Sequence, residues 1–369
     1  MPDPRIVRLA NLLVDYSVNV QPGQRVGINA PVTAAPLVEA VYERVLERGG
    51  FPNLLLGLPG LAALFMRKAS DAQLKYISPF LQAAYCEFEC LISLGGPTNT
   101  REMSAVDPAR QAIQRQAVAP ILETMFKRTA AGEFKWVTTQ YPTDAAAQEA
   151  EMSLREYEDF VYGACHVGDP AVDPVSYWRK VSADHQRLIE WLKPKERVEI
   201  RGPNAELSLS VKGRTFLNAD GQRNMPDGEI FTGPVEDSVN GWVRFTYPVV
   251  AYGREIEGIE LKFEAGRVVQ ASAGKNEAFL LSALDSDAGA RTVGEFAIGT
   301  NFGIQRFTKA ILFDEKIGGS FHMALGAGYP DTGSQNHSSL HWDMICDMRG
   351  GGEIWVDGEL FYQNGEFKV

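Results

Sequence analysis

The sequence predicts a mixed α/β protein of two domains, an N-terminal doubly wound, mostly parallel α/β domain followed by a mostly antiparallel, β-rich (α+β) domain. Three observations support this prediction. The chain has 369 residues, a length typical of about two domains. Helix and strand patterns alternate through its first half. Short alternating strands and hairpin turns fill its second half, so we place the domains at residues 1–193 and 194–369.

Helices in the first half are indicated by apolar residues at a period of 3.6, as in Ile6, Leu9 and Leu13. We expect them at residues 4–18, 35–47, 61–68, 71–84, 107–127, 153–162 and 172–192. Short apolar runs, often closed by paired glycines, indicate the strands. We expect these at residues 25–29, 53–58, 89–94 and 134–139. Repeated strand–helix units predict a parallel sheet with helices on both faces.

The second half changes character after residue 196. Alternating strand patterns occur at residues 197–201, 206–211, 241–247, 259–264 and 267–271. Ala265-Gly266 and Asn364-Gly365 are hairpin turn signals. A mostly antiparallel arrangement follows from these short, turn-connected strands.

Composition and charge exclude several classes of protein. Hydrophobic residues make up 45% and charged residues 22%, which is typical of globular chains. A net charge of −11 argues against a nucleic-acid partner, whose phosphates would need a basic surface. No apolar run reaches the roughly 18 to 20 residues of a membrane span, and the N-terminus lacks a signal-peptide pattern. Four cysteines are too few for a disulfide framework, so we expect a cytoplasmic protein without a membrane partner.

Histidines near the C-terminus are the first candidates for chemistry. His341 and Asp343 are spaced i, i+2 in a strand-like run, so both side chains would face one way. A hydrogen-bonded surface pair is the alternative interpretation. His322 lies in a glycine-rich apolar segment, where a hydrogen-bonded core histidine is the alternative.

Two glutamates have similar surroundings. Glu229 and Glu295 each follow a glycine and precede an apolar run. A carboxylate entering a buried strand is costly unless it is paired or binds a metal. A capping or loop carboxylate is the alternative for each one alone. Taken together, three carboxylates and two imidazoles suit two divalent cations with shared carboxylates.

Four motifs in the second half carry a family resemblance. They are Asn224-x-Pro226-x-Gly228-Glu229, Gly294-Glu295-x-x-x-Gly299-x-Asn301, Gly319-x-x-His322-x-Ala324-x-Gly326 and Asn336-x-Ser338-x-x-His341-Trp342-Asp343. In these motifs and their order, the chain resembles the aminopeptidase T / AmpS / PepS family of metallo-exopeptidases.

The resemblance implies a dinuclear metal site. Glu229, Glu295, His322, His341 and Asp343 fall on its ligand positions, and Tyr329 falls on its catalytic tyrosine. A loop aromatic packed beside Pro330 is the alternative for Tyr329. The resemblance also implies two divalent ions per chain (zinc, cobalt or manganese), peptide substrates and a homodimer.

We therefore expect a metallo-aminopeptidase that hydrolyses the N-terminal residue from short peptides with a bridging water as nucleophile. Glu295 and Asp343 are the expected bridging ligands, Glu229 and His322 would complete one metal, and His341 the other. The first alternative is a non-haem iron ring-cleaving dioxygenase using His322, His341 and Asp343. A binding protein with a relic metal site is the second.

Two further residues near the motifs receive a modest interpretation. Glu315, within Asp314-Glu315-Lys316, is expected in a solvated charge cluster, with a role as a base behind the ligands as the alternative. His337 is expected to be a residue of a pocket rim or of a loop.

Overall fold

The computed structural model describes residues 3–251 and 254–369. The described chain packs into two compact units, residues 3–177 with 221–226, and residues 178–220 with 227–369. Compactness does not test whether either unit folds by itself, so the predicted domain boundary at residue 193 stays a prediction.

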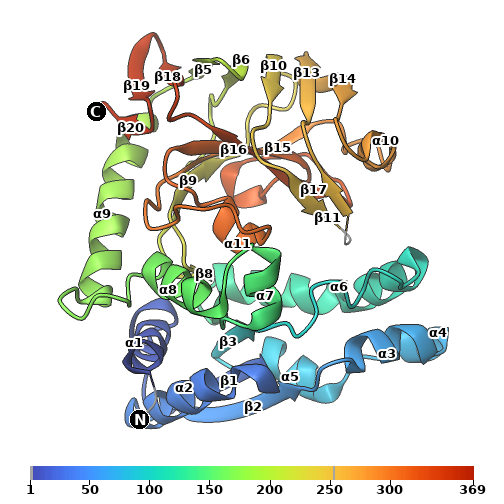
Figure 1. Ribbon diagram of the computed structural model, residues 1–369, viewed down its shortest axis with the longest axis vertical. Helices are drawn as coiled ribbons and strands as arrows, with labels where there is room; N and C mark the ends of the chain where they lie inside the picture. The colour runs from blue at the N-terminus through green and yellow to red at the C-terminus, as the bar shows by residue number, and fades with distance from the viewer. Residues whose placement is uncertain (1–2, 252–253) are drawn as a thin grey trace. The chain divides into compact units, whose positions relative to one another are not determined.

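A five-stranded parallel sheet in the order β2-β1-β3-β4-β8 forms the centre of the first unit (Figure 1). Its strands are β1 (Arg25–Pro31), β2 (Phe51–Gly57), β3 (Cys90–Gly95), β4 (Lys135–Gln140) and β8 (Asn224–Met225). Val26 and Ile28 lie on the same face of β1 and are fully buried, so this face of the central strand is covered. Four of these strands were predicted, and β8 was missed because two residues carry no periodic signal.

The strand order makes this half doubly wound, as predicted. Helix α2 (Ala35–Glu47) connects β1 to β2, whereas α3 (Leu61–Lys68), α4 (Asp71–Leu74) and α5 (Pro79–Cys86) lead back past β1 to β3. Right-handed crossovers that run in opposite directions along a sheet place their helices on opposite faces. In agreement, α2 contacts α1 (Pro4–Leu12), while α5 contacts α6 (Pro108–Ala130).

The helix predicted at residues 71–84 is wrong in one respect, because it is two helices. Ser70 caps α4 with a capping box completed by Gln73. Pro79 then begins α5, since proline lacks an N–H and disfavours helical geometry in the residue before it. The first unit also contains α7 (Asp144–Glu149) and α8 (Leu154–Ala164), and α9 (Pro174–Leu192) begins in it and continues into the second unit.

An eight-stranded sheet in the order β14-β13-β10-β6-β5-β18-β19-β20 is the larger sheet of the second unit, and its paired strands are antiparallel. The strands are β5 (Arg197–Gly202), β6 (Ala205–Ser210), β10 (Asn240–Arg244), β13 (Glu260–Glu264), β14 (Arg267–Ser272), β18 (Glu353–Val356), β19 (Glu359–Gln363) and β20 (Glu366–Phe367). The antiparallel, β-rich prediction for this half is confirmed.

A second antiparallel sheet, in the order β17-β16-β15-β9-β7, carries the motifs. Its strands are β7 (Leu217–Ala219), β9 (Glu229–Thr232), β15 (Val293–Gly299), β16 (Ser320–Gly326) and β17 (His341–Asp347). Smaller elements of this unit are β11 (Val249–Ala251), β12 (Arg254–Ile256), α10 (Glu277–Leu284) and α11 (Ile311–Asp314).

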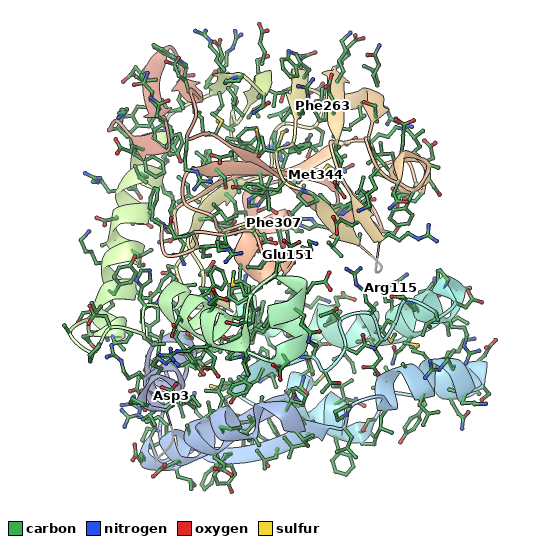
Figure 2. The ribbon with its side chains drawn as sticks, viewed as in Figure 1. Asp3, Arg115, Glu151, Phe263, Phe307 and Met344 are labelled. Atoms are coloured by element: carbon green, nitrogen blue, oxygen red, sulfur yellow. The ribbon has the colours of Figure 1, made fainter. Side chains whose placement is uncertain are left out.

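One hydrophobic core joins the two sheets of the second unit. Figure 2 marks two of its buried members, Phe263 on β13 and Met344 on β17. Because β17 alternates, Met344 enters the core while Asp343 points to the opposite face. One face of this sheet therefore packs against the hydrophobic core, and the other face carries polar side chains.

Two chain-wide features concern membranes and thiols. Among the residues described, no helix combines the length and the apolar composition that crossing a bilayer requires. The four cysteines are free thiols, and Cys90, Cys165 and Cys346 are buried.

Candidate metal centre

All five predicted ligands lie on the five-stranded sheet of the second unit. Glu229 is on β9, Glu295 on β15, His322 on β16, and His341 and Asp343 on β17. Four strands therefore contribute side chains, and every one of these strands pairs with a neighbour that also contributes.

The pairing register places these side chains on one face. Ala324 lies opposite both Glu295 and Asp343, and Gly299 lies opposite Glu229. Residues directly opposite in an antiparallel pair share a face, as do residues two apart along a strand. His322 lies two residues from Ala324, and His341 lies two residues from Asp343. All five predicted ligands therefore lie on the same face of the sheet.

Small residues follow the ligands along β15 and β16, namely Ala297, Gly299, Ala324 and Gly326. Gly299, Ala324 and Gly326 belong to the sequence motifs. A Cβ on Gly299 would lie 2.2 Å from the carbonyl oxygen of Ile317, and a Cβ on Gly326 would lie 2.1 Å from that of Leu340. Both motif glycines therefore permit a close approach of neighbouring backbone.

A β-bulge sets the orientation of Glu295. The register of β15 against β16 shifts between Val293 and Glu295, so Gly294 is the extra residue. A Cβ on Gly294 would lie 2.4 Å from the carbonyl oxygens of both Gly326 and Ala327. Only glycine permits this approach, and the bulge brings Glu295 onto the ligand face.

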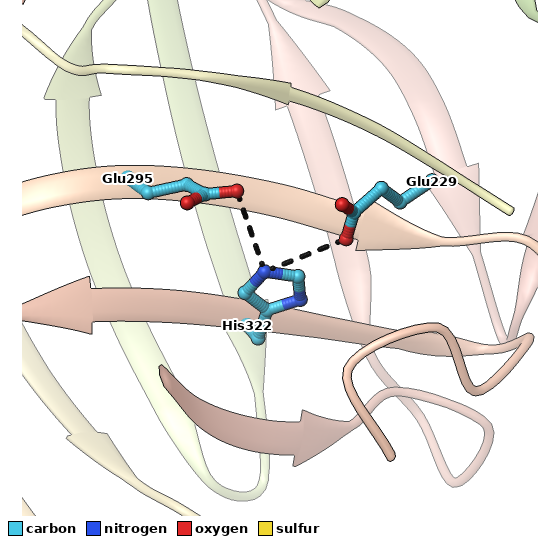
Figure 3. Close-up of side chains that lie close together, drawn as sticks. All are labelled: Glu229, Glu295 and His322. Carbon is cyan, nitrogen blue, oxygen red and sulfur yellow. Dashed lines mark ion pairs between the residues drawn. The ribbon is translucent and has the colours of Figure 1, made fainter. Parts of the chain in front are cut away.

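Distances between the side chains show how closely they converge. His322 Nε2 lies 3.6 Å from Glu229 Oε2, 3.6 Å from Glu295 Oε1 and 3.8 Å from Asp343 Oδ1. Figure 3 shows His322 between the two glutamates. His341 Nε2 lies 3.4 Å from Glu295 Oε2 and 3.5 Å from Asp343 Oδ1. Glu295 therefore turns one oxygen toward each imidazole.

These separations suit divalent cations. Two atoms that bind one zinc ion at about 2.1 Å in tetrahedral geometry lie about 3.4 Å apart. Three overlapping groups of side chains are able to hold an ion. Glu229, Glu295 and His322 form the first, Glu295, His341 and Asp343 the second, and Glu315, His322 and Asp343 the third. Glu229 Oε2 is buried and accepts no hydrogen bond among the described residues. A buried carboxylate oxygen without a donor fits a cation ligand.

Backbone carbonyl groups fix the orientation of both imidazoles. His322 Nδ1 donates to the carbonyl oxygen of Glu315 at 3.0 Å, and His341 Nδ1 donates to that of Ala327 at 2.8 Å. A carbonyl can only accept, so both rings carry hydrogen on Nδ1 and turn Nε2 toward the carboxylates.

Electrostatics confirm that this face concentrates negative charge. Burial lowers the pKa of His341, but the carboxylates of Asp343 and Glu295 raise it to about 11. Burial likewise opposes protonation of His322, yet Glu295 and Glu229 raise its pKa to about 9. Burial raises the pKa of Asp343, but the neighbouring imidazoles hold it near 2. Cation binding needs neutral imidazoles, so it would release protons here.

A buried cluster of charged side chains lies beside the ligands, and it was not predicted from the sequence. The interpretation of Glu315 as solvated is wrong, because its side chain is 15% exposed and that of Lys316 is 2% exposed. The Lys316 ammonium contacts Glu229 Oε1 and lies 2.8 Å from Glu315 Oε1 and 3.6 Å from Asp227 Oδ1. The signal in the sequence was that Glu315 and Lys316 lie a few residues before β16, the strand that carries His322.

Tyr329 lies in the loop between β16 and β17. Its ring meets that of His341 edge-on at 5.3 Å between centroids, and that of Phe231 at 5.5 Å. Tyr329 is 44% exposed as a whole residue, but partial shielding of its phenol from water and the nearby charge of Glu295 raise the pKa of Tyr329. The hydroxyl therefore keeps its proton and can donate a hydrogen bond.

Distant residues hold this loop in place. Glu236 Oε1 accepts from the backbone N–H of Gln335 at 2.7 Å, and Glu236 is itself paired with Arg214. Asp287 accepts from the backbone N–H of Ser339 at 2.8 Å. These anchors were not predicted from the sequence, because none is close to the loop along the chain. His337, expected as a loop residue, is exposed there.

A cavity of about 250 Å³ adjoins the cluster. His341 and Asp343 line it together with the apolar side chains of Phe279, Phe307, Ile311 and Trp342. Its lining offers a place for an apolar group beside two predicted ligands.

Residues 3–367 match the family described as thermophilic metalloprotease (M29). Aminopeptidase 2 of Geobacillus stearothermophilus is 30% identical, covering 98% of this chain and 92% of its own length. Aminopeptidase T of Thermus aquaticus is 25% identical, covering 96% and 94%.

Solved structures show the same fold. Wild-type AmpT from Thermus thermophilus superposes with a TM-score of 0.85 at 21% identity, covering 99% of both chains. A 2,5-dihydroxypyridine dioxygenase from Pseudomonas putida superposes with a TM-score of 0.60 at 13% identity, covering 99% of this chain and 97% of that one. At such identities the likeness concerns the fold alone.

Proposed function

The chain belongs to the thermophilic metalloprotease family M29 and is a metallo-aminopeptidase, a hydrolase, and we propose that it removes N-terminal residues from short peptides at a centre of two divalent metal ions. Glu229, Glu295 and His322 would hold one ion. His341 and Asp343 would hold the other with Glu295 as a shared ligand, and Asp343 as a second bridge. Mixed nitrogen and oxygen ligands suit zinc, cobalt or manganese.

One observation carries the proposal of two ions. Glu295 directs Oε1 toward His322 and Oε2 toward His341, at 3.6 Å and 3.4 Å. A carboxylate with one oxygen in each of two ligand groups is what a bridging ligand requires. A single ion would leave one of these groups without a cation.

The chemistry divides between the ions and the chain. When bound, the two cations supply polarisation of the scissile carbonyl and activation of a bridging water as nucleophile. Tyr329 would donate its hydroxyl hydrogen to the oxygen of the tetrahedral intermediate. A carboxylate of the cluster would receive the free α-amino group of the peptide, which accounts for exopeptidase action.

Metal counting tests this function. We expect about two divalent ions per chain at saturation, and we expect Glu295→Ala to lose both together with peptidase activity. Glu264→Ala, an exposed glutamate of β13 with 61% side-chain exposure, is the matched control and should keep both. Near-normal metal content in Glu295→Ala would remove Glu295 from the ligand set.

The same titration separates the alternative reaction. His322, His341 and Asp343 alone form a two-histidine, one-carboxylate set for iron, and the fold likeness to a dioxygenase favours testing it. One tightly bound iron per chain, with oxygen consumption on hydroxylated aromatic rings and no release of amino acids, would support that alternative. Two ions and amino-acid release would exclude it.

Partner and location are also proposed. A homodimer is supported by strand β2, which lies at the sheet edge and exposes Phe51, Leu54 and Leu56 at 60%, 47% and 49%. Leu54→Lys should shift the mass in solution toward that of the monomer.

A cytoplasmic location is supported by the free thiols of all four cysteines, because thiols stay reduced in the cytoplasm.

A further inference from the structure

Lys316 lies among carboxylates in a place where a charge is costly. Its side chain is 2% exposed, and its ammonium contacts Glu229 Oε1, with Glu315 Oε1 at 2.8 Å and Asp227 Oδ1 at 3.6 Å. A buried ammonium persists only when opposite charges surround it. The cluster satisfies that need, and the lysine in turn fixes the carboxylates that it contacts.

The contact with Glu229 is asymmetric. Lys316 takes Oε1, while Oε2 is buried, accepts no hydrogen bond from the described residues and lies 3.6 Å from His322 Nε2. Oε2 is therefore the oxygen turned toward the ligand group that contains Glu295 and His322. A carboxylate free at both oxygens could instead bind a cation through both.

Residue 315 couples the lysine to the imidazole. The carbonyl oxygen of Glu315 accepts from His322 Nδ1 at 3.0 Å, and the next side chain along the chain is that of Lys316. The Lys316 carbonyl accepts from the backbone N–H of Asn301 at 3.0 Å, which ties the segment to the end of β15. One short segment thus orients two members of the same ligand group.

We propose that Lys316 is a positioning residue of the metal centre, which occupies Oε1 of Glu229 and so makes Glu229 a ligand through Oε2 alone. This inference rests on the proposed function in one respect, that Glu229 is a metal ligand. In this proposal Lys316 acts through Glu229 and is not itself a metal ligand.

Cobalt provides a readout that does not depend on activity. Lys316→Met keeps the length of the side chain and removes the ammonium. In the cobalt-loaded protein we expect a weaker visible absorption, because a carboxylate released to bind through both oxygens raises the coordination number. We also expect metal affinity to fall roughly 10- to 100-fold, as for other residues that orient ligands.

A double-mutant comparison tests the pathway through Glu229. In a Glu229→Gln background, Lys316→Met should change cobalt affinity by less than about two-fold, because both changes disturb one interaction. Lys195→Met is the matched control. Lys195 is 13% exposed and pairs with Glu359 at 2.6 Å, and its removal should leave spectrum and affinity unchanged.

The outcomes are distinguishable. A wild-type cobalt spectrum and affinity in Lys316→Met, with or without a lower melting temperature, would overturn the proposal and leave Lys316 a structural residue. If the methionine variant does not fold, Lys316→Gln should show the same affinity loss, and wild-type affinity there would equally overturn it. Unchanged metal content in Glu229→Gln alone would instead contradict the ligand set of the proposed function.

Discussion

At the scale of single residues, the ligand face combines groups whose roles depend on their exact surroundings. His322 and His341 have the same chemistry, but different carbonyls fix them and their exposure differs, at 1% and 30% of the side chain. Tyr329 stands beside them with its proton retained. Individual substitutions therefore separate the contributions of metal binding, transition-state stabilisation and packing.

Tyr329→Phe should lower kcat roughly 10²- to 10³-fold, because it removes one donor to the developing oxyanion. KM and metal content should stay close to the parent values, since the hydroxyl acts mainly in the transition state. The measurement is steady-state hydrolysis of an aminoacyl-arylamide with metal analysis of the same preparation. A kcat within a few-fold of the parent would assign Tyr329 a packing role.

His185 provides a pH-dependent stability test outside the ligand set. It is buried, and its ring nitrogens bond to Asn218 Oδ1 at 2.8 Å and Thr300 Oγ1 at 2.7 Å. Burial lowers the pKa of His185 below 6.5. Its contribution to stability is therefore complete above pH 6.5 and is lost as the pH falls through 6.5 toward the folded-state pKa.

Urea unfolding of the parent and of His185→Gln measures this effect. The difference in unfolding free energy between them should shrink between pH 8 and pH 5.5 with metal at saturation throughout. A constant difference for His185→Gln would contradict a neutral buried imidazole.

At the scale of elements, register decides the site. The row formed by Glu295, Ala324 and Asp343 exists because β15, β16 and β17 pair with one bulge at Gly294. A one-residue slip would turn Glu295 into the hydrophobic core. The strands themselves were predictable from alternation, but the bulge was not, because one extra residue leaves no periodic trace.

Gly294→Ala should destabilise the protein by about 1–3 kcal/mol, since the new Cβ overlaps backbone oxygens that cannot move independently. It should also weaken metal binding by displacing Glu295. Gly350→Ala is the matched control, because no atom lies within 4 Å of its added Cβ. Thermal melts and metal titrations of both variants make the measurement, and equal behaviour would show that the bulge tolerates a side chain.

At the scale of the whole molecule, metal and fold are expected to be coupled. Three carboxylate ligands and the neighbouring acids repel one another unless cations or protons offset their charge. Ions that bind only the folded chain stabilise it by about 2.7 kcal/mol at a free concentration 100-fold above Kd.

Chelation should therefore lower the melting temperature by several degrees, and zinc, cobalt or manganese should restore it. Tyr329→Phe should show the same recovery, because its metal content is unaffected. A melting temperature insensitive to chelation and refilling would contradict metal binding at the cluster.

The sequence by itself determined the local features of this protein. Periodicity located most helices and strands, since apolar spacing follows from the geometry of each element alone. Composition determined the globular class and the acidic charge. The five candidate ligands and Tyr329 were identified through the resemblance of four motifs to a known family. A spacing such as His341-x-Asp343 places two side chains on one face but does not by itself indicate a metal.

Only the tertiary structure shows which distant segments of the chain contact one another. Strand β8 joins a parallel sheet from beyond the predicted boundary, and Glu229 reaches His322 through the register of three strands. Lys316 was interpreted from sequence as solvated, yet it is buried between Glu229 and Glu315. Burial and pairing depend on contacts between distant segments, and neither spacing nor composition encodes which segments those are.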